Sequence, residues 1–185
     1  MSKYLAGSLI IVAFIIGVAF GYYLTPEYAN LKSVSSHDGL GKADKYIDLR
    51  FINGMIAHHK AALYMLDQVK AKSNRKELQD LADFIIALDT QGISDLYAMK
   101  KEKYGDEREI NKYGKMNLGP ADDKFDLRFL NAMIVHHEEA ISVSKDLMAK
   151  SHYSKSIETA DAAIKLLSDN LITLKEWRLN WYNVK

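Results

Sequence analysis

The chain contains the same twelve-residue pattern twice, and this repeat constrains its fold more than any other feature. Residues 48–59 read DLRFINGMIAHH, and residues 126–137 read DLRFLNAMIVHH. The two copies are offset by 78 residues, and the same offset relates positions beyond the histidines, such as Ser73 and Ser151. A pattern of this length kept in one register indicates that the chain is a duplicated unit with an N-terminal addition.

Each copy has the periodicity of an amphipathic helix, but it places polar residues on the apolar face. At about 100° per residue, Asp48 and His59 fall near the middle of the apolar face, and His58 falls at its edge. Asp126 and His137 occupy the same places in the second copy. Polar groups that face a core cost free energy unless they have a partner, so these residues are expected to have one.

Helical periodicity continues to the C-terminus and predicts an all-α fold. The expected helices cover residues 43–72, 75–104, 122–150 and 154–183. Two helical hairpins joined by the longer connection 105–121 would form a four-helix bundle over residues 43–183.

The long connection favours one topology of this bundle. When extended, residues 105–121 can span more than about 50 Å, whereas a helix of thirty residues is about 45 Å long. The chain can therefore return along the bundle, so that the first and third helices are antiparallel neighbours, as in ferritin-like bundles. A simple up-down-up-down bundle is the alternative, since it also satisfies the helix pattern.

In the ferritin-like arrangement, the two copies of the repeat face each other about a pseudo-twofold axis. We then expect Asp48 to approach His137 and Asp126 to approach His59. The two copies would form one central polar site, or two symmetric ones.

The N-terminus carries a separate signal. Residues 5–24 form a run of about 20 residues without a charge, which is the length of a membrane-spanning helix. We expect residues 1–24 to be an uncleaved membrane anchor and residues 25–42 to be a linker. A cleaved secretory signal is the alternative, and both place the bundle on the periplasmic or extracellular side of the membrane.

Two glycines in this segment suggest a self-association surface. Gly17 and Gly21 have the G-x-x-x-G spacing that brings two membrane helices together. A homodimer through the anchor is therefore a possible arrangement.

The residue types available for chemistry favour a soft metal ion. The chain has no cysteine, so any metal must be held by histidine, methionine or carboxylate side chains. Each copy places a thioether one helical turn before a histidine pair. Imidazole with thioether favours copper, as Cu(I) above all or as Cu(II), or silver, over Mg²⁺ or Ca²⁺. The candidate ligands are Met55, His58, His59, Met133, His136 and His137. Asp48 and Asp126 could orient the ligating imidazoles.

Other functions have weaker support in the sequence. The Glu-x-x-His pairs of di-iron bundles, the H-E-x-x-H motif and Gly-rich phosphate loops are all missing, so we do not expect an enzyme. The formal net charge of +1 gives no reason to expect a nucleic-acid partner. The main alternative to metal binding is a structural or interaction module whose Asp–His pairs only fix the helix packing.

The repeated pattern D-x-x-F-x-x-x-M-I-x-H-H resembles the family of domain of unknown function 305. The resemblance covers about residues 43–183 and extends to Gln91 and Met99, whose counterparts in the second copy are Asp169 and Trp177. It implies an exported, ferritin-like helical protein. Some members of this family are linked to copper binding and tolerance in the periplasm, and the six candidate ligands match the positions implied by that role.

Overall fold

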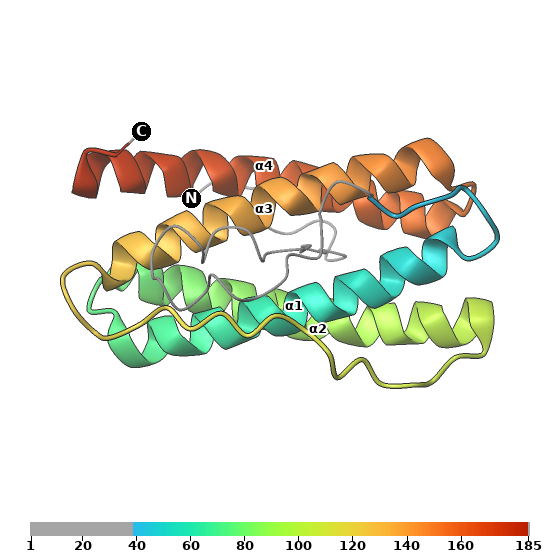
Figure 1. The fold of residues 1–185 in the computed structure, drawn as a ribbon, viewed down its shortest axis with the longest axis horizontal. Coiled ribbons are helices and arrows are strands. Elements are labelled where there is room, and N and C mark those ends of the chain that lie inside the picture. Colours follow the sequence, from blue (N-terminus) through green and yellow to red (C-terminus); the bar gives the residue numbers. More distant parts are fainter. Residues whose placement is uncertain (1–38, 185) are drawn as a thin grey trace, which may run out of the picture.

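The computed structural model describes residues 39–184, which form four α-helices (Figure 1). The helices are α1 (Ile47–Lys72), α2 (Lys76–Tyr104), α3 (Phe125–Lys150) and α4 (Ser154–Tyr182). The prediction of an all-α four-helix bundle is confirmed. The expected membrane helix at 5–24 lies outside the described residues, and none of the four helices within 39–184 is long and apolar enough to cross a membrane.

Helices α1 and α3 begin three or four residues later than the sequence pattern predicts. The reason is a local turn before each helix. The side chain of Asp44 accepts a hydrogen bond from the backbone N–H of Tyr46 (2.9 Å), and Asp122 accepts one from Lys124 (3.0 Å). An aspartate that bonds the backbone two residues ahead favours a turn over a helix.

Helices α1 and α3 pack against each other and run antiparallel. At one end of the bundle, Ser151, directly after α3, donates a hydrogen bond to Asp48 in the first turn of α1 (2.5 Å). At the other end, Arg75, beyond the end of α1, pairs with Asp126 in the first turn of α3 (3.2 Å). The start of each helix therefore lies beside the end of the other.

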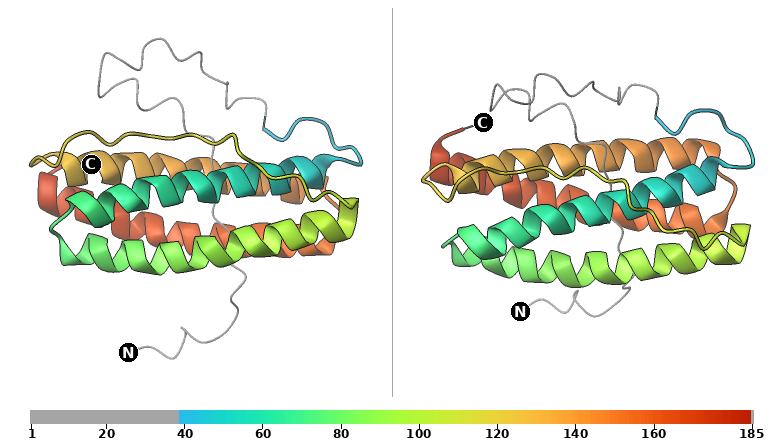
Figure 2. Two further views of the ribbon diagram at one scale, coloured as in Figure 1. Left: turned by 90° about the horizontal axis from the view of Figure 1, so that it is seen from below. Right: turned by 60° about the horizontal axis from the view of Figure 1, so that its bottom comes forward.

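The connection between α2 and α3 runs along the outside of α1, as predicted from its length (Figure 2). Near the middle of α1, the Lys60 ammonium donates to the carbonyl of Ile110 (2.9 Å). At the end of α1, the Lys72 ammonium donates to the carbonyl of Gly119 (2.7 Å). The simple up-down-up-down alternative needs no such return segment.

The structure shows that the duplicated unit starts earlier than residue 48. The backbone N–H of Leu40 donates to Asp146 of α3 (2.8 Å), and its carbonyl accepts a hydrogen bond from Arg50 (2.6 Å). The second copy makes the equivalent contacts through Leu118, Gln68 and Arg128. Each loop before a motif helix is therefore held by the first helix of the other half, which joins the two halves into one unit.

The apolar core is divided into two clusters. The first contains residues from the early part of α1 and the late part of α3, including Phe51, Met55 and Leu147. The second contains residues from the late part of α1 and the early part of α3, including Phe129 and Met133. The two histidine pairs fall between these clusters along both helices, so they form a polar layer across the middle of the bundle.

Candidate functional site

The four motif histidines form one buried layer at the crossing of α1 and α3. His58 and His136 meet there, with ring centroids 3.9 Å apart and ring planes at 65°. His59 and His137 lie beside them, at 5.9 Å from His58 and 6.1 Å from His136 respectively. All four side chains are at most 3% exposed. The two copies of the repeat therefore come together through their histidines, whereas the prediction was contact between the aspartate of one copy and a histidine of the other.

The places of the two histidines within each pair differ from the prediction. His58 and His136 were expected at the edge of the apolar face, but they lie at the centre of the layer. A helical wheel of one helix identifies its apolar face without saying which neighbour each part of that face meets. Because the pseudo-twofold axis passes between α1 and α3, positions 58 and 136 face each other and the following histidines are turned to the side.

Burial keeps three histidines of the layer, His58, His136 and His137, uncharged at neutral pH. Desolvation lowers the pKa of His58 well below its ordinary value, and the neighbouring His136, His59 and His137 lower it further. The pKa of His136 is also well below the ordinary range, mainly through burial. Burial lowers the pKa of His137 to about 4. Neutral imidazole is the form that binds a metal ion.

His59 has a carboxylate partner in α2. Nδ1 of His59 lies 2.7 Å from Oδ1 of Asp89 in α2, and both side chains are almost fully buried. The position equivalent to Asp89 in the second half is Leu167. The two halves of the site therefore differ, although their motifs are nearly identical.

Several ring nitrogens in the layer have no hydrogen-bond partner within the described residues. They are Nδ1 and Nε2 of His137, Nε2 of His136 and Nε2 of His59. A buried polar atom without a partner costs free energy, of the order of 1–3 kcal/mol. Such atoms in a folded protein require an explanation, and a bound ion or water molecule is the usual one.

The two motif methionines flank the layer from opposite sides. Met55 and Met133 are fully buried, and they belong to different core clusters. Each lies three and four residues before the histidines of its own helix, so its side chain and theirs are neighbours on one helix face. The thioethers are therefore in position to contribute to a site at the layer.

The predicted Asp48–His137 and Asp126–His59 pairs are not formed. Asp48 accepts from Ser151 and pairs with Lys103 of α2 (2.5 Å), and Asp126 pairs with Arg75. The reason is axial distance, because each aspartate lies ten or eleven residues before its histidines, which is about 15 Å along a helix. In an antiparallel pair it meets the end of the partner helix rather than the middle. The two aspartates fix the ends of the bundle and do not orient the imidazoles.

Asp89 is a site residue that the sequence reasoning missed, although its signal is present. The apolar positions of α2 recur at Leu78, Ala82, Ile85 and Leu96, with helical spacing. Asp89 falls in this series, where a leucine would be expected. A carboxylate on an apolar face indicates a buried partner, but the sequence does not say which residue that partner is.

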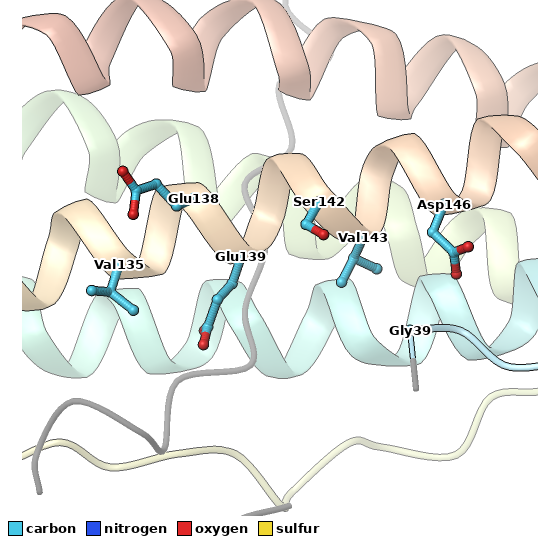
Figure 3. Close-up of a pocket in the computed structure, with 7 residues that line it drawn as sticks. All are labelled: Gly39, Val135, Glu138, Glu139, Ser142, Val143 and Asp146. Carbon is cyan, nitrogen blue, oxygen red and sulfur yellow. The ribbon is translucent and has the colours of Figure 1, made fainter. Parts of the chain in front are cut away.

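A surface pocket of roughly 280 Å³ lies on the outer side of α3 (Figure 3). Its lining includes Glu138 and Asp146 but none of the predicted ligands. Asp146 is bonded to Leu40 and Lys150, and Glu138 pairs with Lys175 (2.6 Å). These carboxylates have structural partners, so the pocket is not the candidate site.

The donor types of the histidine layer restrict which metal ions it could bind. Within residues 39–184, no three side chains drawn from histidine, aspartate and glutamate lie close enough together to hold a metal ion. Imidazole and thioether donors are typical of softer ions.

The fold is similar to that of solved structures described as CopM. CopM in the Cu(I)-bound form is 26% identical to this chain, with a TM-score of 0.65, and the similarity covers 73% of this chain and 97% of that chain. CopM in the apo form gives 26% identity, a TM-score of 0.65 and coverage of 73% and 98%. CopM in the Cu(II)-bound form, at 23% identity and a TM-score of 0.66, covers 73% and 97% and shows the likeness of fold. No curated protein sequence gives a significant match.

The family described as Domain of unknown function (DUF305) matches residues 33–100 and 48–122 in two overlapping alignments. Both alignments contain Met55 and the first histidine pair. The match over 48–122 contains the whole of α2, and the match over 33–100 contains α2 as far as Lys100. The second motif lies beyond them and is identified by its register with the first. The chain belongs to the DUF305 family.

Proposed function

We propose that this protein is a membrane-anchored, exported helical bundle that binds a soft metal ion, Cu(I) in particular, for copper handling or tolerance. The observation that carries the proposal is the buried histidine layer, in which four imidazole nitrogens lack a partner within the described residues. A soft metal ion bound there would supply the missing interactions. The 26% identity to CopM in its Cu(I)-bound form supports the same metal.

The donor set fits such an ion. Its ligands would be drawn from the four histidines, fewer than three of them at one point as the described side chains stand, together with the thioethers of Met55 and Met133 on either side. The histidines with lowered pKa values are already neutral, so binding a metal at neutral pH requires no proton to be removed from them. A thioether together with imidazole favours Cu(I) over Mg²⁺ or Ca²⁺, which prefer oxygen ligands.

A structural module is the second candidate, and one contact favours it. The His59–Asp89 hydrogen bond joins α1 to α2 and would fix their packing without any metal. This accounts for one nitrogen of the layer. It does not account for His137, whose two nitrogens are both buried without a partner.

Methionine-to-leucine variants test the metal site without disturbing the fold. In the purified full-length protein, Met55→Leu combined with Met133→Leu should weaken Cu(I) and Ag(I) binding about tenfold or more, because a thioether donor is lost in each half. Zn(II) binding should not change. The unfolding free energy of the apo protein should fall by less than about 1.5 kcal/mol, since the swap conserves volume. Competition with a chromophoric Cu(I) chelator measures the affinity.

The matched control is Met99→Leu combined with Met148→Leu, which replaces one partly buried and one exposed methionine outside the layer. It should keep the affinity of the unchanged protein. Equal loss in both double variants would show that the methionines act through general packing. An unchanged protein that binds Cu(I) and Ag(I) no more tightly than micromolar would leave the structural module as the function.

The proposed location is tested by protease accessibility. Residues 5–24 are proposed to anchor the chain, with the bundle on the outer side of the membrane. Protease added to cells with a permeabilised outer barrier should degrade the bundle while a cytoplasmic marker survives. Protection of residues 43–183 under these conditions would place the bundle inside and contradict the proposal.

A further inference from the structure

We propose that Asp89 positions His59 as a ligand of a soft metal ion, by accepting the hydrogen of Nδ1 and so leaving Nε2 to bind the ion. This inference rests on the proposed metal-binding function and assigns a role within that site. It starts from the contact between Nδ1 of His59 and Oδ1 of Asp89, which is 2.7 Å long.

The contact fixes the tautomer of His59. A carboxylate can only accept a hydrogen bond, so the hydrogen between the two groups belongs to Nδ1. A second hydrogen on Nε2 would be a buried donor with no acceptor, since Nε2 of His59 has no partner among the described residues. The Nδ1–H tautomer avoids this cost and leaves the lone pair on Nε2. A carboxylate behind a ligating histidine commonly has this effect.

Asp89 makes one hydrogen bond among the described residues. Its Oδ1 contacts His59, and its Oδ2 is buried without a hydrogen-bond partner. This geometry leaves Nε2 of His59 as the nitrogen available to a metal ion. Cu(I) and Ag(I) are the soft ions that imidazole with thioether donors favours.

The second half of the chain provides an internal comparison. His137 occupies the equivalent position in α3, but the residue equivalent to Asp89 is the buried Leu167. Both nitrogens of His137 lack a partner, so nothing in the described residues fixes its tautomer. His59 is therefore the pre-arranged ligand of the pair, and His137 is the adaptable one.

The first test reads the tautomer in the apo protein and needs no metal. Long-range ¹H–¹⁵N correlation spectra of the full-length protein distinguish a protonated Nδ1 from a protonated Nε2. We expect His59 to be protonated at Nδ1, and Asp89→Leu to abolish that single-tautomer pattern. A proton on Nε2 of His59 in the unchanged protein would overturn the inference, whatever the metal affinity is.

The second test measures Cu(I) and Ag(I) affinity. Asp89→Leu should fold, because the other half has leucine at the same place, and it should bind Cu(I) and Ag(I) about 10–100-fold more weakly. Asp95→Leu removes another carboxylate of α2, one that bonds Gln91 instead of a histidine, and should keep the original affinity. Equal affinity of Asp89→Leu and the unchanged protein would overturn the positioning role while leaving the metal site intact. If the unchanged protein binds neither ion, the proposed function fails, and the role of Asp89 in metal binding fails with it even where the spectra show Nδ1–H.

Discussion

Replacing His59 and His137 together by alanine should lower the Cu(I) affinity of the protein more than about 100-fold. Residues that only orient a ligand typically change metal affinity by about 10–100-fold, and this double variant removes two imidazole ligands themselves. The affinity is measured by competition with a Cu(I) chelator of known strength. His152→Ala, which removes an exposed histidine in the turn between α3 and α4, should leave the affinity unchanged.

The same variant separates metal binding from a purely structural role. If the histidines serve only packing, the unchanged protein has no tight Cu(I) affinity to lose, and the main effect falls on stability. The His59→Ala change leaves Asp89 without its partner, at a cost of about 1–3 kcal/mol or more. Asp48 and Asp126 keep their own partners, Ser151 and Arg75, so they add nothing to this cost. A double variant that binds Cu(I) as tightly as the unchanged protein would remove both histidines from the site.

Acid should destabilise the apo bundle strongly between about pH 6.5 and pH 4. In this range an unfolded histidine binds a proton, whereas His137 in the folded protein, with a pKa of about 4, does not. Stability therefore rises with pH through this window and is fully present above it. His137 alone contributes a loss of about 3 kcal/mol on acidification. His58 and His136, whose pKa values are also lowered, add to it.

Urea unfolding at a series of pH values measures this effect. His137→Leu should flatten the dependence of the unfolding free energy on pH, because one titrating group is removed. His152→Gln should leave the dependence as it is, since that side chain is exposed in both states. Bound Cu(I) should protect the bundle at pH 7 and lose this protection in acid, where protons compete for the same nitrogens. A stability that does not change between pH 7 and pH 4 would contradict a buried, neutral histidine layer.

The duplication made the equivalence of the two motif helices predictable from the sequence, but it left their contacts open. The 78-residue offset showed that the two motifs are structurally equivalent and can be related by a pseudo-twofold axis, but it does not fix the level along the helices at which they meet. The same offset also relates Leu40 to Leu118 and Asp89 to Leu167. The identical leucines extend the repeat towards the N-terminus, and Asp89 with Leu167 marks a position where the two halves differ. The structural role of either pair can be recognised only from the contacts that its residues make.

The sequence by itself determined the helices, the bundle and the pairing of the two repeat copies about a pseudo-twofold axis, because these depend on periodicity and on a repeat that can be read along the chain. The tertiary structure decided which histidines face each other and which side chains hold the aspartates. Those outcomes depend on the axial level at which α1 crosses α3 and on the neighbour that each helix face meets. Asp48 therefore bonds Ser151, 103 residues away, and His59 bonds Asp89 on a different helix from the one expected. A helical pattern specifies the direction of a side chain around its own axis, and only packing specifies what lies in that direction.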